Sequence, residues 1–297
     1  VIVTEDGVCG INFEHSVAEG IVLVNFVEET LKYVDAEISK KDIGSPTIKR
    51  EPIKLAWKVD SKLNQMITDC QGDMDKLVED TEVCILVYEG FGKELPKSKK
   101  ISPDALFQLV LQLTHYRCHN YLVSTYESAS IRRFKFGRVD NIRSAHPQAL
   151  AWVKIMQDKA ATLDMKLQSF RTAVQQQTKV MKDNVTGYGI DNHLVALREL
   201  SKAEGSLPSM FEDPMFGEIM RFPLSTSQVP QSYVGTWVGY GPVVPDGYGC
   251  CYNPTAHDIQ FMISAFRSSK RTSAAKFKEN LLSALDDTKD FLQNYEP

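Results

Sequence analysis

The sequence predicts an α/β protein with a large mixed sheet. Apolar residues recur with a helical period at residues 19–38 and 60–80. An uncharged, β-branched segment occupies residues 83–88, and strand-like segments separated by glycine and proline fill residues 222–266. Because helical and strand-like segments are mixed along the whole chain, the class is α/β, or α+β with one large mixed sheet.

The N-terminal region begins with a short strand-like segment at residues 8–13, which leads into the helical pattern at residues 19–38. Residues 39–51 are polar, contain Gly44 and Pro46, and follow neither period. Such a composition is typical of a linker. A domain boundary is therefore expected near this segment.

A strong helix-start signal lies in the middle of the chain, after a lysine-rich loop at residues 92–101. Ser102, Pro103 and Asp104 combine a capping hydroxyl, a proline at the first helical position and an acid that favours the helix dipole. The helix that begins here should bury Leu106 and Leu109. The remaining elements expected are a strand-like segment at 124–136, long helices within 147–200 and an amphipathic helix at 273–292.

Composition excludes several classes of protein. The 297 residues include 34 basic and 38 acidic side chains, a net charge of −4, so binding of nucleic acid is not expected. The longest uncharged stretch, residues 222–245, contains four prolines, so no membrane-spanning helix is expected. Six cysteines without a C-x-x-C motif suit a reducing compartment, and with no signal peptide at Val1 we expect a cytoplasmic protein that is a piece of a longer one.

Among the histidines, His15 is the candidate general base, because it lies at a strand-to-helix turn, where side chains often meet ligands. A surface histidine is the alternative. His115 and His119 have a ligand-like spacing, but no H-E-x-x-H glutamate accompanies them, and we expect no metal site. His146 is expected at the surface.

Hydroxyl and basic side chains form three further clusters. The residues 225–228 (S-T-S-Q) could end a strand or support a developing oxyanion, and no G-x-S-x-G elbow surrounds any serine. Lysines crowd residues 93–100, and arginines and a lysine crowd residues 132–143. Such runs usually form a solvated face, but beside a helix start they could bind a phosphorylated small ligand.

Five separated segments resemble the choline/carnitine acyltransferase family, in the family's order. They are Phe13-Glu14-His15-Ser16, residues 125–130 (T-Y-E-S-A-S), residues 137–144 (G-R-V-D-N-I-R-S), residues 225–229 (S-T-S-Q-V) and residues 241–249 (G-P-V-V-P-D-G-Y-G). The resemblance implies two chloramphenicol-acetyltransferase-like two-layer α/β halves with a mixed sheet. Residues 1–54 would be the tail of the first half, carrying the catalytic histidine, and residues 55–297 the second half.

The resemblance also implies a mechanism without a covalent acyl-enzyme. His15 would be the catalytic base, and Ser227 would donate a hydrogen bond to the tetrahedral oxyanion. Lys93 and Lys97, in the G-K-x-x-x-K pattern, would hold the 3′-phosphate of coenzyme A, and Asp104 would lie near its adenine end. Acetyl-coenzyme A is then a co-substrate, and no bound cofactor is expected.

The acceptor positions distinguish the two branches of the family. Carnitine-type members hold a carboxylate with an arginine and two threonines, whereas this chain has Asn192, Val139 and Asn141 at the matching positions. We therefore expect choline as the acceptor, with Tyr240 and Tyr126 beside its trimethylammonium group. Carnitine acetyl transfer, and an inactive fragment that only binds coenzyme A or choline, are the alternatives. The missing N-terminal half would be the chain's partner.

Overall fold

The computed structural model describes residues 1–16, 18–40, 53, 55–228 and 237–296. It divides the chain into two compact units. The described part of the first lies within Val1–Glu79, and the second comprises Asp80–Gln228 and Trp237–Pro297. Most of the linker expected at residues 39–51 lies outside the described residues, and so does Val229, the last residue of the S-T-S-Q-V segment.

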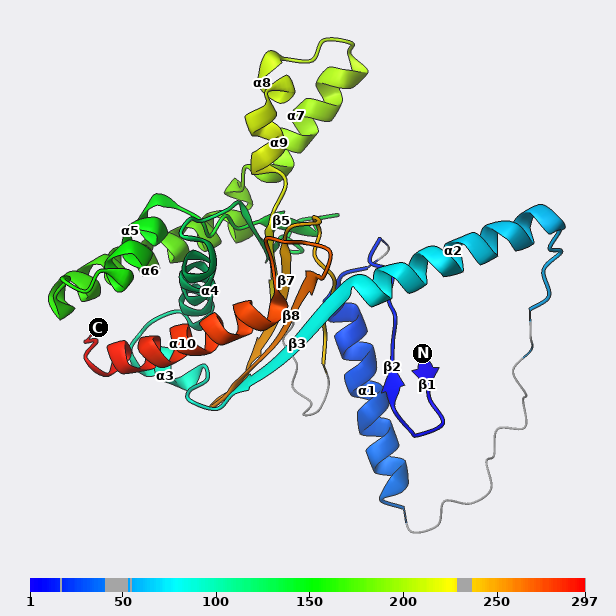
Figure 1. The fold of residues 1–297 in the computed structure, drawn as a ribbon, viewed down its shortest axis with the longest axis horizontal. Coiled ribbons are helices and arrows are strands. Elements are labelled where there is room, and N and C mark those ends of the chain that lie inside the picture. The colour runs from blue at the N-terminus through cyan, green and yellow to red at the C-terminus, as the bar shows by residue number, and fades with distance from the viewer. Residues whose placement is uncertain (17, 41–52, 54, 229–236, 297) are drawn as a thin grey trace. The chain divides into compact units, whose positions relative to one another are not determined.

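The first unit contains a two-stranded hairpin and two long helices (Figure 1). Strand β1 (Ile2–Val3) pairs antiparallel with β2 (Cys9–Gly10), and the helices are α1 (Gly20–Ile38) and α2 (Ser61–Asp80). Both helices were predicted, but the strand expected at residues 8–13 has only two paired residues. A strand extends only as far as its partner, and the described partner is β1.

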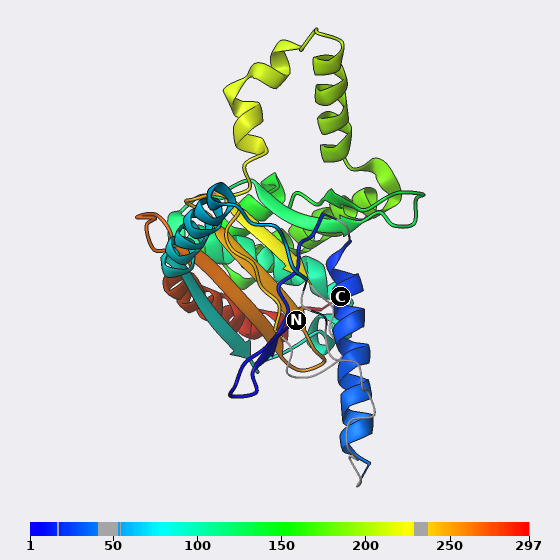
Figure 2. The ribbon, with the colours of Figure 1, turned by 90° about the vertical axis from the view of Figure 1, so that its right-hand side faces the viewer.

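The second unit is built on a six-stranded mixed sheet of order β3-β8-β7-β6-β4-β5, seen more nearly face-on in Figure 2. Strand β6 runs parallel to β4 and to β7, and the other neighbours are antiparallel. The predicted α/β class with a mixed sheet is thereby confirmed. The strands are β3 (Thr81–Tyr88), β4 (Thr125–Ser130), β5 (Val139–Asn141), β6 (Leu224–Gln228), β7 (Tyr248–Pro254) and β8 (Ile259–Phe266).

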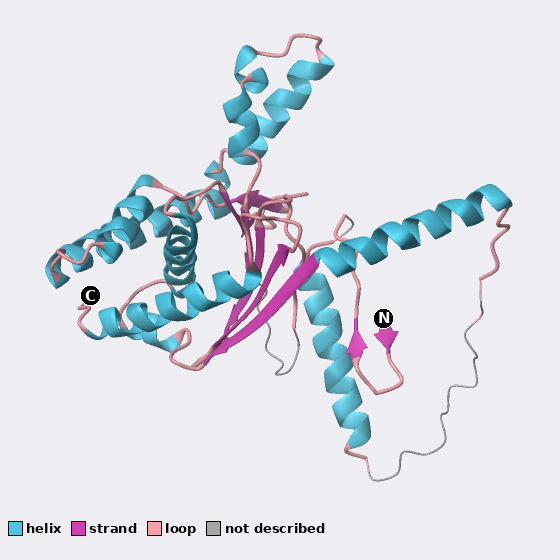
Figure 3. Cartoon of the chain, in the orientation of Figure 1, coloured by secondary structure: helices cyan, strands magenta, loops and turns pink. Residues whose placement is uncertain are grey.

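Helices cover one face of this sheet and make a two-layer arrangement (Figure 3). Helices α4 and α10 pack together and α10 packs on β3, while α5 and α6 pack beside α4. The helical segments are α3 (Glu94–Ser98), α4 (Pro103–His119), α5 (Pro147–Gln157), α6 (Leu163–Asp183), the π-helical turn η1 (Asn184–Tyr188), α7 (Asp191–Ala203), α8 (Ser209–Glu212), α9 (Pro214–Ile219) and α10 (Ala274–Gln293).

The core of the second unit lies between the sheet and the helices. As predicted, Leu106 and Leu109 of α4 are fully buried, and α4 begins after Ser102, whose Oγ accepts a hydrogen bond from the amide of Ala105 at 3.4 Å. Burying such large apolar side chains is the main stabilising contribution. The largest fully buried side chains include Trp152, Tyr248, Tyr252, Phe107, Phe170, Phe261 and Phe277.

Several expectations from the sequence need correction. The lysine-rich loop contains the short helix α3, and the strand expected at residues 124–136 ends at Ser130 and returns as β5. The long helical pattern breaks at Gly187, whose φ of +90° suits glycine and whose Cβ position faces the ring of Phe134. Among the described residues, no helix is both long and apolar enough to cross a membrane.

His146 is also corrected, from surface to interior. Its Nδ1 accepts a hydrogen bond of 3.1 Å from the amide of Ala149 and thereby caps α5, and its ring is buried beside that helix. Burial lowers the pKa of His146, because the charged imidazolium would lose its hydration.

Candidate functional site

His15 lies in the first unit between β2 and α1, and its side chain is 62% exposed. Its Nε2 is 3.8 Å from a carboxylate oxygen of Glu19, and its ring lies 5.7 Å from that of Phe13. The preceding Glu14 accepts hydrogen bonds from the amide and the hydroxyl of Ser16, which lower the pKa of Glu14. The imidazole is therefore accessible and lies beside a carboxylate.

Ser227 lies in the second unit, on β6, where successive side chains point to opposite faces of the sheet. Thr226 points into the core, where its hydroxyl donates to the carbonyl of Tyr126 at 2.7 Å and accepts from Gln108 at 2.9 Å. Strand alternation therefore places Ser227 on the face that the helices leave uncovered, in register with Cys251 of β7. It is half-buried there and available to a ligand on that face.

Tyr240 is fixed against β6 and β7. Its hydroxyl donates to the carbonyl oxygens of Ser225 at 3.0 Å and Cys250 at 3.3 Å, and its own carbonyl accepts from the Ser264 hydroxyl at 2.6 Å. Burial of the hydroxyl raises the pKa of Tyr240 well above its ordinary value. These three hydrogen bonds fix both the ring and the backbone of Tyr240.

Tyr126 contacts Phe222, and Phe222 lies beside Arg143. The rings of Tyr126 and Phe222 meet edge to face at 5.4 Å, and the guanidinium carbon of Arg143 lies 5.3 Å from the centre of the Phe222 ring. Arg143 was assigned to a run of basic residues that usually forms a solvated face. Instead, its side chain is 26% exposed and paired with Asp191.

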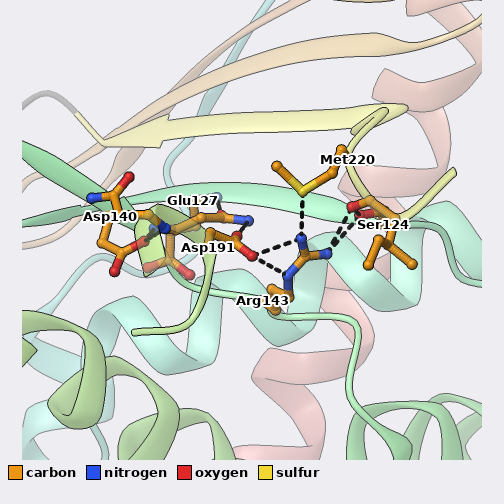
Figure 4. A network of polar contacts seen from close by, with 9 residues as sticks. Ser124, Glu127, Asp140, Arg143, Asp191 and Met220 are labelled. Atoms are coloured by element: carbon orange, nitrogen blue, oxygen red, sulfur yellow. Dashed lines mark hydrogen bonds and ion pairs between the residues drawn. The ribbon is translucent and has the colours of Figure 1, made fainter. Parts of the chain in front are cut away.

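The Asn141 side chain is fixed at both ends of its amide. Its Oδ1 accepts from the amide of Glu127 at 3.0 Å, and its Nδ2 donates to Asp191 at 2.5 Å. Arg143 binds the same carboxylate through Nε at 2.9 Å and Nη2 at 2.8 Å (Figure 4). The α7 start is therefore tied to β5 and the segment after it by charge-assisted hydrogen bonds.

Asn192 adjoins the same network. Its backbone amide donates to Asp140 at 3.2 Å, and its side-chain Nδ2 donates to the carbonyl of Val139 at 2.8 Å. The structure therefore brings together Val139, Asn141 and Asn192, three positions separated by up to 53 residues in sequence. Asp191 and Arg143 were not identified from the sequence as members of this group, although Arg143 lies in the quoted segment 137–144 and Asp191 directly precedes Asn192.

The two lysines assigned to coenzyme A lie one helical turn apart around α3. The amide of Lys93 donates to the carbonyl of Thr255 at 2.9 Å, and Lys97 forms an exposed ion pair of 3.0 Å with Glu94. Gly92 permits this packing, because a Cβ there would lie 2.6 Å from the Asp258 amide nitrogen. The two ammonium groups can therefore face the same ligand from one end of the sheet.

Asp104, in the first turn of α4, belongs to a buried polar cluster. Its carboxylate accepts a hydrogen bond of 2.7 Å from the Tyr252 hydroxyl, which in turn accepts one of 3.0 Å from Gln108.

Glu127 was not identified as a candidate from the sequence. The alternation of a strand in residues 125–130 is the signal that could have found it. Burial, the charge of Asp104 and a hydrogen bond to it raise the pKa of Glu127 well above its usual range.

His115 and His119 have partners other than a metal. Their rings lie 4.6 Å apart, His115 Nδ1 is 2.9 Å from the Tyr121 carbonyl, and His119 Nε2 is 3.0 Å from the Tyr248 hydroxyl. The described residues include no group of three or more His, Cys, Asp or Glu side chains arranged to hold a metal ion.

Comparison with known proteins adds the family. Residues 1–283 match the family described as Choline/Carnitine o-acyltransferase. Choline O-acetyltransferase of Homo sapiens is 43% identical over 97% of this chain and 39% of its own length, and that of Mus musculus is 42% identical over 100% and 47%. Carnitine O-acetyltransferase of Rattus norvegicus is 39% identical over 99% of this chain and 47% of its own length.

The chain thus belongs to the choline/carnitine acyltransferase family, as the five motifs predicted. It spans about half the length of the curated relatives that it matches.

Proposed function

We propose that this chain is the C-terminal half of a choline O-acetyltransferase, which transfers acetyl from acetyl-coenzyme A to choline. The observation that carries the proposal is the group formed by Val139, Asn141 and Asn192. All three replace the carboxylate-binding side chains of carnitine-type members, and they share one hydrogen-bonded network. Without a bidentate arginine at position 192, carnitine loses its main anchor.

In this proposal His15 acts as the general base. It takes the hydroxyl proton of choline while the oxygen attacks the acetyl carbon, and it returns that proton to the coenzyme A sulfur as the carbon–sulfur bond breaks. Glu19, 3.8 Å away, stabilises the imidazolium between these steps. Ser227 donates a hydrogen bond to the oxyanion, a contribution of about 3 kcal/mol in comparable sites.

The two substrates would bind on either side of the reacting atoms. Lys93 and Lys97 would hold phosphate groups of coenzyme A, and Asp104 would lie near its adenine end. Tyr240 and Tyr126 would contact the trimethylammonium group through their ring faces, worth about 1 kcal/mol or more. A trimethylammonium group is common to choline and carnitine, so these two tyrosines do not select between them.

An N-terminal half is part of the proposal. Residues 1–54 would be the tail of that half and residues 55–297 the second half. Both α1 and α2 expose large apolar side chains, such as Phe26, Tyr33, Met66 and Val78, which suits helices that a further part of the protein covers. We place the protein in the cytoplasm, where it would serve acetylcholine synthesis.

The test follows the release of free thiol from acetyl-coenzyme A, with choline or carnitine as acceptor. It uses the chain as given and the chain extended by the residues that precede it in its parent protein. We expect turnover with choline in the extended protein and its loss in His15→Ala. Ser227→Ala should lower kcat about a hundredfold.

Two outcomes support the alternatives. Faster turnover with carnitine than with choline would identify a carnitine acetyltransferase. Binding of coenzyme A or choline without any thiol release, in both forms of the protein, would identify a catalytically inactive binding module. Either result would reject the proposed acetyl transfer to choline.

A further inference from the structure

The loop at residues 131–138 joins β4 to β5 at one edge of the sheet, and the mechanism proposed above gives it no role (Figure 1). Its sequence, I-R-R-F-K-F-G-R, contains four cationic and two aromatic residues and no acidic one. Residues 132–136 are all exposed. Unlike Arg143 of the same basic run, the cations of this loop therefore lie at the surface.

Phe136 lies at a position that neither core packing nor backbone preference explains. It is 91% exposed, and its φ of +62° falls in the left-handed region, which favours glycine or asparagine and disfavours a bulky side chain. A large apolar side chain at such a position stabilises neither the loop nor the core. An outlier of this kind points to a role in binding.

The loop is held in one shape by its own backbone. The amide of Ile131 donates to the carbonyl of Arg138, and the amide of Gly137 donates to the carbonyl of Phe134, both at 3.0 Å. Gly137 is required there, because a Cβ would lie 2.1 Å from the carbonyl oxygen of Ile131. The side chains are thus presented on an ordered loop, so binding loses little backbone entropy.

A second segment adds an aromatic ring to this surface. Gly187 of η1 packs on the Phe134 ring, which would lie 3.0 Å from a Cβ at that position. The residue after it, Tyr188, is 79% exposed, and Phe134 itself is 45% exposed. Together these residues form a surface that we name the aromatic–basic patch: Arg132, Arg133, Phe134, Lys135, Phe136 and Tyr188.

Both aromatic rings of the loop lie beside a cation. The guanidinium carbon of Arg133 is 5.9 Å from the centre of the Phe134 ring, and Lys135 Nζ is 5.1 Å from the centre of the Phe136 ring. At a bilayer surface, aromatic rings enter the boundary between headgroups and acyl chains, while long basic side chains reach the phosphates. An acidic protein would satisfy the cations but would need a pocket for each exposed ring, whereas a bilayer accepts a ring at any point.

We propose that the aromatic–basic patch binds the surface of a membrane that contains anionic lipids, with the Phe136 ring inserted at the headgroup level. The cations of the loop pair with lipid phosphate and carboxylate groups. Such binding is peripheral and reversible, because one loop buries only a small apolar area. It does not depend on the proposed acetyl transfer.

The test is flotation of the protein, extended by the residues that precede it, with lipid vesicles. One set contains phosphatidylcholine with about a quarter phosphatidylserine, and the other contains phosphatidylcholine alone. We expect binding to the first set only. Raising the salt from about 0.1 M to about 0.5 M should weaken it, because the attraction to the lipid charges is screened.

Two substitutions separate the charge from the ring. Lys135→Gln should weaken vesicle binding about fivefold, whereas Lys159→Gln, the same change in an exposed turn elsewhere, should leave it nearly unchanged. Phe136→Asn should weaken binding roughly tenfold without lowering the thermal midpoint, since asparagine tolerates the left-handed backbone. Leu200→Asn, which removes another exposed apolar side chain, is the matched control.

Insertion of the ring is measured with Phe136→Trp. The fluorescence of the new side chain should shift to shorter wavelength with the anionic vesicles and not with phosphatidylcholine alone. An unshifted emission, or equal vesicle binding by Phe136→Asn and the unmodified protein, would overturn the proposed insertion.

Other results would overturn the membrane partner itself. Binding to heparin without binding to anionic vesicles would identify an acidic macromolecule instead. Vesicle binding by the chain as given, but not by the extended protein, would show that the preceding part of the protein covers the patch. Thiol release from acetyl-coenzyme A tests the proposed function separately.

Discussion

His115 offers a direct test of the buried interior, because it is only 3% exposed and, within the described part of the chain, contacts no acidic side chain that would stabilise a proton. Burial, and to a smaller extent the neighbouring His119, lower the pKa of His115 from 6.5 to about 4. His115→Asn removes the titrating ring. The amide of asparagine can still donate toward the Tyr121 carbonyl, which Nδ1 contacts at 2.9 Å.

The sign follows from the two states of the protein. Below about pH 6.5 the unfolded chain binds a proton at His115 that the folded chain does not bind until about pH 4, so stability falls as pH falls through this window. Above the window the group contributes no pH dependence. The expected loss from this residue is about 2 kcal/mol at pH 5 and about 3 kcal/mol at pH 4.

The assay is urea unfolding, followed by the fluorescence of the buried Trp152, at several values between about pH 8 and pH 4. The difference in unfolding free energy between the unmodified protein and His115→Asn isolates this residue, because other titrating groups are present in both proteins. His193→Asn, at an exposed position of α7, is the matched control substitution.

A pH-independent difference between the unmodified protein and His115→Asn would refute this reasoning. It would mean that the imidazole is hydrated or can move to water when it is protonated. The unfolding free energy of the unmodified protein minus that of His115→Asn should increase as pH rises from about 4 to 6.5, and a decrease over this range would contradict the sign itself.

Three further substitutions test the second unit. Ser102→Ala removes the hydroxyl that caps α4 and should cost about 1 kcal/mol in urea unfolding; an unchanged midpoint would exclude the cap. Tyr252→Phe removes the hydrogen bond to Asp104 and should cost about 1.5–3 kcal/mol at neutral pH by the same assay, and a neutral effect would show that the carboxylate is satisfied by water. Gly92→Ala places a Cβ against Asp258 and should weaken the proposed binding of coenzyme A, measured by calorimetry, more than Gly217→Ala, where a Cβ meets no atom within 4 Å. Equal effects of the two substitutions would show that the packing of α3 does not affect coenzyme A binding.

Elements whose formation depends on neighbouring residues in the chain were predicted correctly from the sequence. The start of α4 was predicted from Ser102, Pro103 and Asp104, because capping and dipole effects act within one helical turn. The helix at residues 19–38 was predicted from its period, and the strand at residues 83–88 from its uncharged, β-branched composition. The helix α3 was missed because a single short turn carries too little periodicity, and its packing depends on Thr255, more than 150 residues away.

Candidate residues could be named from motifs, but not their surroundings. Glu127 and His146 look like ordinary polar residues in the sequence. Glu127 is buried by contacts with Asp104 and Gln177, and His146 is buried by the core around α5. Likewise Arg143 belonged to a basic run in sequence, and its pairing with Asp191 depends on α7 returning to β5. A local window can show strand alternation, as at Glu127, but not the distant partners that bury a side chain.

The sequence alone determined which side chains could carry chemistry here, the mixed α/β class and the resemblance to one family, because residue type, short-range periodicity and motif order are properties of the linear chain. The tertiary structure alone decided the strand order, with β8 inserted between β3 and β7, and the assembly of Val139, Asn141 and Asn192 around the Arg143–Asp191 pair. Those features depend on contacts between residues some 50 or more positions apart, whose formation is set by how the whole core packs.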